Sequence, residues 1–265
     1  SAPSGEQVHA LGAEVGNVYV ADLRTQRVYL LTAGADSANE LPFKDLRAPK
    51  DVAVDNSGDV YVIDVDDTSS EHRVLRLESG SEAAADLPIS GLHAPTSIAV
   101  DDSGTIYVTD TQNSVSTNRL LQLTPGAERW TEIDHPGLEY PSFVTVDASG
   151  NLYATDSNRT VAKRPAGSTG WTEIVPDDVA AGIDRTLLGL TTDAAGNVYV
   201  VGNTRDEGQD VAAMKGVILK VNPATNSVTE THLKETGFLV DVAVDSSGSL
   251  YVTDETNHRV LKVAD

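Results

Sequence analysis

The sequence contains no cysteine, so disulfide bonds, thiolate metal sites and a cysteine nucleophile are all excluded. Basic residues are also scarce, because 19 lysines and arginines stand against 40 aspartates and glutamates, for a formal net charge of −21. A chain with this charge is repelled by phosphate backbones and by anionic membrane surfaces. We therefore expect a monomer with no nucleic-acid partner and no direct membrane contact.

Long apolar runs are absent as well. No segment approaches the ~20 apolar residues that a membrane helix needs. The first residues, SAPSGEQ, are small and polar and do not resemble a signal sequence. They are compatible with the N-terminus of a mature exported protein, or with a boundary chosen within a longer protein. No helical periodicity of useful length occurs, which favours an all-β fold.

What the sequence does contain is a repeat. The phrase DNSGDVYVID, which starts at Asp55, returns in four further versions, and a degraded version, AEVGNVYVAD, starts at Ala13. The glycines of successive copies lie 42 to 52 residues apart. These glycines are Gly16, Gly58, Gly104, Gly150, Gly196 and Gly248. Six copies with such a period indicate a repeat architecture.

Each copy predicts four strands. In copy two these are Asp51–Asp55, Asp59–Asp64, Arg73–Leu77 and Ala83–Ile89. The first two strands are apolar on both faces, so each sheet must be buried between two others. The sequence therefore predicts a six-bladed β-propeller of four-stranded antiparallel blades, with residues 1–265 as a single domain.

Two features recur so regularly that a structural role is the natural interpretation. The strand-two tyrosines are expected to pack between blades; they are Tyr19, Tyr61, Tyr107, Tyr153, Tyr199 and Tyr251. The turn aspartates are expected to cap the turn between strands one and two; they are Asp55, Asp101, Asp147, Asp193 and Asp245.

Aspartate and arginine recur in the same way at the two ends of the loop between strands two and three. The pairs are Asp22/Arg27, Asp64/Arg73, Asp110/Arg119 and Asp254/Arg259. A catalytic pair is expected in one copy only, so we interpret these pairs as ion pairs that hold the loop base.

The ring lacks one strand at its end. Copy six stops at Asp265 before a fourth strand, and an open edge is a liability that propellers often cover with the N-terminus. The segment GEQVHA (residues 5–10) is the candidate for this closing strand.

Two segments, VAVDNSGDVYVID…HRVLRL and VAVDSSGSLYVTDETNHRVLKV, resemble NHL repeats. The links LPFKDLRAP and LPISGLHAP are most similar to those of the extracellular propeller of mycobacterial receptor serine/threonine kinases. This resemblance implies an extracellular or cell-surface sensor propeller. Related propellers include RNA-binding modules, an amidating lyase, streptogramin lyases and gluconolactonases, so the fold by itself does not select a function.

A binding site is predicted on the face that carries the loops between strands two and three. Residues at the start of strand one vary from copy to copy and should line the mouth of the central channel on this face. They are Lys50, Asp51, Thr96, Ser97, Ser142, Phe143, Gly189 and Asp241. Two loops on this face are long, VDDTSSEH (65–72) and TQNSVSTN (111–118), and copy five carries the insertion NTRDEGQDVAAMKG (203–216).

No cofactor and no catalytic residue is predicted. Acidic residues of two loops are oxygen ligands of the kind that Ca²⁺ takes, but the spacing of an EF-hand is absent; they are Asp64, Asp66, Asp67, Glu71, Asp206, Glu207 and Asp210. His72, His93, His135 and His258 fall in loops of the same face, away from the strand-one positions.

The function that we expect is therefore non-enzymatic recognition of a protein, peptide or cell-wall ligand on the rim of an exported propeller. The alternative is a metal-dependent lyase or hydrolase of the lactonase or streptogramin-lyase type. A third alternative is a scaffolding repeat protein.

Overall fold

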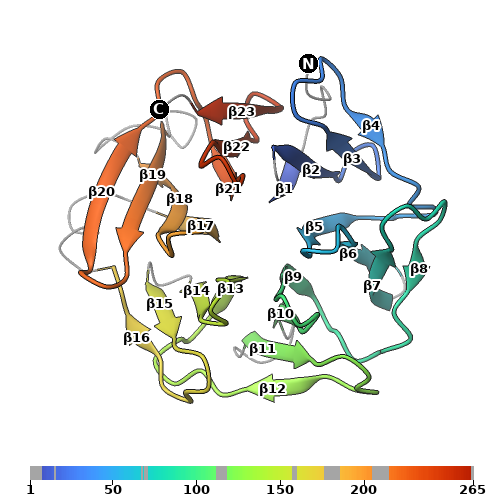
Figure 1. The fold of residues 1–265 in the computed structure, drawn as a ribbon, viewed down its shortest axis with the longest axis horizontal. Coiled ribbons are helices and arrows are strands. Elements are labelled where there is room, and N and C mark those ends of the chain that lie inside the picture. Colours follow the sequence, from blue (N-terminus) through green and yellow to red (C-terminus); the bar gives the residue numbers. More distant parts are fainter. Residues whose placement is uncertain are drawn as a thin grey trace.

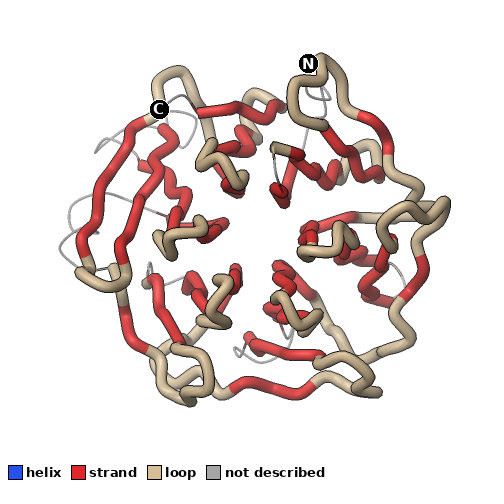
Figure 2. Tube along the Cα trace, viewed as in Figure 1, coloured by secondary structure: helices blue, strands red, loops and turns tan. Residues whose placement is uncertain are grey.

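The computed structural model describes residues 8–14, 16–66, 68, 71–111, 118–156, 160–175, 186–204 and 215–263. Six antiparallel sheets stand radially around one axis, which confirms the predicted six-bladed β-propeller (Figure 1). The innermost strands are β1 (Val8–Glu14), β5 (Pro49–Val54), β9 (Pro95–Val100), β13 (Pro141–Val146), β17 (Thr186–Thr192) and β21 (Leu239–Val244). Within the described residues all regular elements are strands, and no helix has the length and hydropathy of a membrane span (Figure 2).

The first three blades each contain four strands in chain order from the axis outward. Blade one comprises β1 (Val8–Glu14), β2 (Asn17–Asp22), β3 (Arg27–Leu31) and β4 (Asn39–Glu40). Blade two comprises β5 (Pro49–Val54), β6 (Val60–Asp66), β7 (Glu71–Leu77) and β8 (Ala85–Asp86). Blade three comprises β9 (Pro95–Val100), β10 (Ile106–Thr111), β11 (Asn118–Leu123) and β12 (Thr131–Ile133).

The last three blades follow the same plan, except that the described part of blade six has three strands. Blade four comprises β13 (Pro141–Val146), β14 (Leu152–Asp156), β15 (Val161–Arg164) and β16 (Thr172–Glu173). Blade five comprises β17 (Thr186–Thr192), β18 (Val198–Thr204), β19 (Lys215–Asn222) and β20 (Ser227–His232). Blade six comprises β21 (Leu239–Val244), β22 (Leu250–Asp254) and β23 (Arg259–Val263).

The unbroken apolar runs of the second strands arise because both faces of a blade are buried. In β6, Val60 and Val62 belong to the apolar cluster between blades one and two, whereas Tyr61 and Ile63 belong to the cluster between blades two and three. Side chains alternate across a strand, so successive residues point into the interfaces with the two neighbouring blades. This is the physical reason for the pattern from which the propeller was predicted. We call each interface between adjacent blades a seam.

The outer strands are shorter than the sequence suggested. The predicted strand Ala83–Ile89 is reduced to β8, Ala85–Asp86. The amide of Leu87 still donates to the carbonyl of Val74 at 2.8 Å, but Pro88 has no N–H with which to continue the ladder. In blade five the outer strand β20 extends over six residues.

The tyrosines and the turn aspartates play the predicted parts, and they are also joined to each other. All six tyrosines are at most 8% exposed. In blades two to six the tyrosine hydroxyl donates to the second carboxylate oxygen of the turn aspartate at 2.9–3.1 Å. The first carboxylate oxygen accepts two backbone amides of the turn, as between Asp55 and the amides of Ser57 and Asp59. One carboxylate thus fixes both the turn and the inner tyrosine.

A cation completes this unit in four blades. Arg76, Lys163, Lys220 and Lys262 lie 5.2–5.9 Å from the ring centres of the tyrosines opposite them on strand two. Burial and the charge of Asp55 raise the pKa of Tyr61 to about 12. Tyr61 is therefore a neutral hydrogen-bond donor throughout the physiological range.

The closing strand was predicted in the wrong place for half of its length. Val8–Ala10, the end of the segment GEQVHA, lie in β1, the innermost strand of blade one, and pair with β2. They therefore cannot form an outer strand of blade six. Residues 5–7 lie outside the described residues. Strands β1 and β21 contact each other, so blades six and one meet at the axis (Figure 1).

Replacement of Tyr61 by phenylalanine should lower the free energy of unfolding by about 1–2 kcal/mol, because a hydrogen bond to a carboxylate is lost while the ring stays. The same change at Tyr153 should cost less, since Asn151 also donates to that oxygen of Asp147, at 2.8 Å. Urea unfolding of the two variants measures the difference. Equal losses, or no loss at Tyr61, would contradict this account.

Candidate functional site

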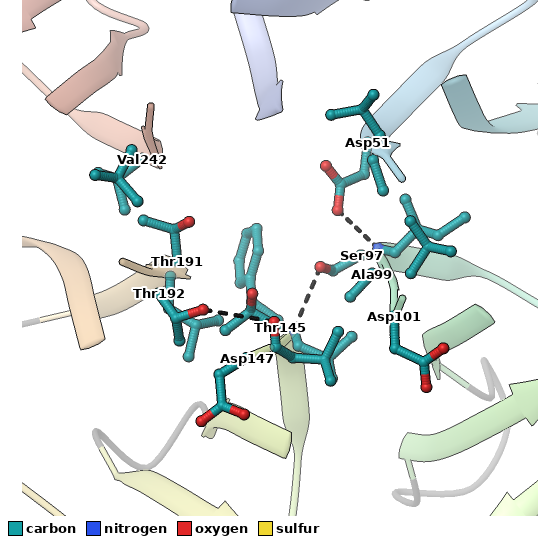
Figure 3. A pocket seen from close by; sticks show the side chains of 18 of the residues that line it. Asp51, Ser97, Ala99, Asp101, Thr145, Asp147, Thr191, Thr192 and Val242 are labelled. Carbon is teal, nitrogen blue, oxygen red and sulfur yellow. Dashed lines mark hydrogen bonds between the residues drawn. The ribbon is translucent and has the colours of Figure 1, made fainter. Parts of the chain in front are cut away.

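The channel along the propeller axis is the first candidate site. It has a volume of about 290 Å³ and is lined by the inner strands and by several of the turns (Figure 3). Each inner strand has an irregular register near its start, where one or two residues bulge out of the pairing with strand two. These bulges position the side chains that the sequence placed at the mouth.

Asp51 joins two blades. Its carboxylate Oδ2 accepts the amide of Ile98 in β9 at 2.7 Å, and Oδ1 accepts the amide of Val52 at 2.7 Å (Figure 3). The residue is only 5% exposed. The carboxylate therefore supplies the acceptor for an inner-strand amide of the neighbouring blade.

Blade three repeats this connection with neutral groups. Ser97 Oγ accepts the amide of Val144 in β13 at 3.3 Å (Figure 3). Beside it, Thr96 Oγ1 donates to the carbonyl of Ser142 at 2.9 Å. The seam between blades three and four is thus also closed by side chains at the start of strand one.

The seam between blades five and six is closed by contact. A Cβ atom added to Gly189 would lie 2.0 Å from Asp241 Oδ1 and 2.6 Å from its Cα. Asp241 Oδ1 accepts the amide of Val242, and the Asp241 amide donates to Thr253 Oγ1, both at 2.8 Å. Glycine at position 189 is required by this close approach.

The eight predicted mouth residues therefore divide into two groups. Asp51, Ser97, Phe143 and Asp241 line the channel. Lys50, Thr96, Ser142 and Gly189 lie at or beside the bulges and are not among the channel-lining residues. The structure brings the first group together around the axis, and a ligand contact with either group stays a prediction.

Asp51 is also electrostatically unusual. Burial disfavours its charged form and, against the hydrogen bonds from Ile98, Ser97 and Val52, raises the pKa of its carboxyl to about 7. A carboxyl with such a pKa changes between its protonated and ionised forms near neutral pH. This property would suit a general acid or base, or a pH-dependent connection between blades.

The second candidate site is a cleft on the loop face of blade two, beside the links that precede and follow this blade, which we call the loop-face cleft. Its volume is about 630 Å³. Arg47 pairs with Asp66 at 2.7 Å. Arg73 pairs with Asp64 at 3.0 Å and with Asp86 at 3.2 Å. The link residues Leu87, Pro88, Ile89, Ser90, Gly91 and Leu92 form the opposite wall.

Three of the four predicted aspartate–arginine pairs form. They are Asp64/Arg73, Asp110/Arg119 and Asp254/Arg259. The aspartates also bind the link before their own blade, as when Asp64 Oδ1 accepts the amides of Arg47 and Ala48 at 2.8 Å. The prediction for Asp22/Arg27 is wrong, because Arg27 pairs with Glu40 at 2.6 Å. Asp22 instead accepts the amides of Arg24 and Thr25.

The residues considered as metal ligands are used differently where the structure describes them. Asp64 and Asp66 are held by arginines. His72 lies in β7 and not in a loop, and the ring of His135 is 2.9 Å from the carbonyl oxygen of Leu138. Within the described ranges, no three histidine, aspartate or glutamate side chains lie close enough to hold a metal ion. Asp67, Asp206, Glu207 and Asp210 lie outside those ranges, and the side chain of Glu71 is not described.

Comparison with known proteins supports the repeat and the fold. Residues 236–263 match the NHL repeat family. No curated protein matches the chain. Among solved structures, hydrazine synthase from Kuenenia stuttgartiensis has a TM-score of 0.69 at 16% identity, over 96% of this chain and 76% of that one.

Two further structures are similar. A chain of the nidogen/laminin complex has a TM-score of 0.68 at 16% identity, over 89% of this chain and 84% of that one. Virginiamycin B lyase from Staphylococcus aureus has a TM-score of 0.63 at 12% identity, over 96% and 94%. At these identities the likeness shows the propeller fold and not a shared activity.

Replacement of Asp51 by asparagine should change how stability depends on pH. Because the folded-state pKa is raised from 3.8 to about 7, the stability of the native protein associated with this group is complete below pH 4 and is lost as the pH rises to 7. The variant lacks this loss. Its stability relative to the native protein should therefore increase from pH 4 to pH 8, on the order of a few kcal/mol.

Urea unfolding at pH 5 and pH 8 tests this, with replacement of the exposed Glu82 by glutamine as the control. A constant difference between the Asp51 variant and the native protein across this range would show that Asp51 does not titrate there.

Replacement of Gly189 by alanine should destabilise the protein by more than about 2 kcal/mol, because the added methyl group overlaps Asp241. Gly170 is the matched control, since a Cβ there meets its nearest atom at 3.8 Å. Thermal unfolding of the two variants should show a large loss at Gly189 and almost none at Gly170. Similar melting temperatures would refute the close approach.

Proposed function

We propose that this propeller is a non-catalytic recognition module, outside the cell or on its surface, that binds a polypeptide segment on its loop face. The observation that carries the proposal is the loop-face cleft. It lies beside the lengthened loop of copy two, and a volume of about 630 Å³ is comparable with that of ligand sites in general.

The chemistry of the loop-face cleft suits a polypeptide. Part of its lining consists of the ion pairs Arg47–Asp66 and Arg73–Asp86. The more exposed members, Arg47 and Asp86, can form ion pairs with a bound polypeptide instead. Another part of the lining presents Leu87, Ile89 and Leu92 from the link, which can take apolar side chains. Mixed polar and apolar surface of this kind is typical of transient protein interfaces.

Two resemblances support the same proposal. The links are similar to those of receptor-kinase sensor propellers, which is our reason for an exported location. A chain of the nidogen/laminin complex, which comes from an assembly of proteins, has the same fold.

A channel enzyme of the lyase or hydrolase type is the second candidate, and Asp51 favours it as a carboxyl of raised pKa on the channel wall. The described channel residues do not offer a set of three ligands for a divalent metal, so a metal-dependent mechanism does not fit them. Stoichiometric zinc or magnesium in the purified protein, lost when Asp51 is replaced by asparagine, would favour the enzyme.

The recognition proposal can be tested with peptides selected from a displayed random library on the purified protein. Replacement of the exposed Ser90, in the loop-face cleft, by tryptophan fills the site. It should weaken the selected peptides at least about tenfold, or about 1.4 kcal/mol. Fluorescence anisotropy with labelled peptides measures the affinity.

The matched control is Ser81→Trp, because Ser81 is an exposed serine of the same blade outside the cleft lining. Its peptide affinities should stay within about twofold of the native values. Failure to select any peptide, or equal affinities for the two variants, would sink the proposal.

A further inference from the structure

The seam between blades two and three is distinct on the face opposite the loops, where the turns between strands one and two lie. The second residue of these turns is Asn56 in blade two and Asp102 in blade three, alanine in blades four and five, and serine in blade six. Asn56 Nδ2 donates to Asp102 Oδ1 at 2.5 Å and so connects the two turns. Both residues line the channel on one side and a separate cleft on the other.

This second cleft, which we call the turn-face cleft, has a volume of about 740 Å³. That volume lies within the range of about 300–1,000 Å³ that is typical of small-molecule sites. Its apolar lining comes from blade three and from the link between the blades: Leu87, Ile89, Ile106, Leu123, Pro125 and Ala127. The turn-face cleft therefore offers apolar side chains to an aliphatic body.

The charge of the lining is negative. Arg76 is the one basic residue among the described residues that line the turn-face cleft, and it is held by Asp59 at 2.5 Å and by Glu78 at 3.5 Å. Burial disfavours ionisation of Asp59, but the hydrogen bonds from Ser79 and Arg76 outweigh it and lower the pKa of its carboxyl. Arg76 is thus paired with a carboxylate that is ionised at neutral pH.

Two carboxylates remain available to a ligand. Asp55 and Asp101 cap their turns and accept tyrosine hydroxyls. Asp102 and Glu128 are exposed, and neither forms an ion pair within the described part of the chain. Both belong to blade three: Asp102, in the turn between β9 and β10, borders the channel as well as the cleft, and Glu128 lies in the turn between β11 and β12.

We propose that the turn-face cleft binds a linear aliphatic amine, whose methylene groups lie along the apolar lining and whose ammonium groups meet Asp102 and Glu128. An anion is disfavoured by the carboxylates, and a neutral hydrocarbon leaves them without a partner. An exposed ion pair by itself contributes little, so the apolar body is as necessary to binding as the charge. This site is separate from the proposed polypeptide site on the loop face.

The probe is hexamethylenediamine, and the comparison compound is hexanediol, which has the same aliphatic body without charge. Isothermal titration at low salt should show one site for the diamine, with affinity at least about tenfold above that of the diol. An equal affinity for the two compounds, or no binding of the diamine, would overturn the proposal.

The double variant Asp102→Asn/Glu128→Gln removes both carboxylates, while asparagine at position 102 can still accept the hydrogen bond from Asn56. Its affinity for the diamine should fall about tenfold. Glu82→Gln/Glu132→Gln is the matched control, because it changes net charge equally at two exposed sites outside the cleft lining. A similar loss in both double variants would show general counterion attraction and would overturn the site.

Melting temperatures of the two double variants should agree with that of the native protein, which verifies that both are folded. The variant Ser90→Trp on the loop face should bind the diamine with native affinity. A weakened affinity there would place the amine in the wrong cleft and contradict the proposal. Loss of peptide binding in that variant, by contrast, concerns the proposed function alone.

Discussion

The inner strands of a propeller have one edge without a partner strand, and this edge faces the axis. Their amide groups must still be satisfied, because a buried amide without an acceptor costs about 1–3 kcal/mol. At two seams of this protein the acceptor comes from the neighbouring blade: the Ile98 amide donates to Asp51, and the Val144 amide donates to Ser97. The rest of the ring depends on these side-chain connections, because they set the relative position of adjacent blades at the axis.

This constraint explains why residues that vary at the mouth need not be free for a ligand. Asp51 and Asp241 look like rim residues in a sequence, yet both carboxylates are buried and hydrogen-bonded. Two seams satisfy an inner-strand amide with different groups, a carboxylate in one and a hydroxyl in the other, whereas the seam between blades five and six brings Gly189 against Asp241. Variation among repeats therefore reflects alternative solutions for the seams as well as any recognition of ligand.

Much of the fold could be predicted because it arises from local rules that repeat. The turn aspartate, the glycine and the tyrosine recur in register, and the structure joins the aspartate to the tyrosine. The bulges at the start of strand one could not be predicted, since they depend on how blades meet and leave no local signal. The failed pair Asp22/Arg27 shows the same limit: Glu40, on the outer strand, competes for the arginine. The sequence shows Asn56 and Asp102 at the second position of their turns. That the two side chains form a hydrogen bond depends on how blades two and three pack, and it is known only from the structure.

The link between blades two and three borders both clefts. Leu87, Pro88 and Ile89 line the loop-face cleft on one side and the turn-face cleft on the other. The Leu87 amide still donates to the carbonyl of Val74, and Pro88 has no N–H with which to continue the ladder, so the link leaves the sheet at this point. The inner connections, from Asp51 to Ile98 and from Asn56 to Asp102, hold the seam between these two blades closed at the axis. The stretch of chain that follows blade two therefore borders both proposed sites, while the connections at the axis come from inner strands and turns.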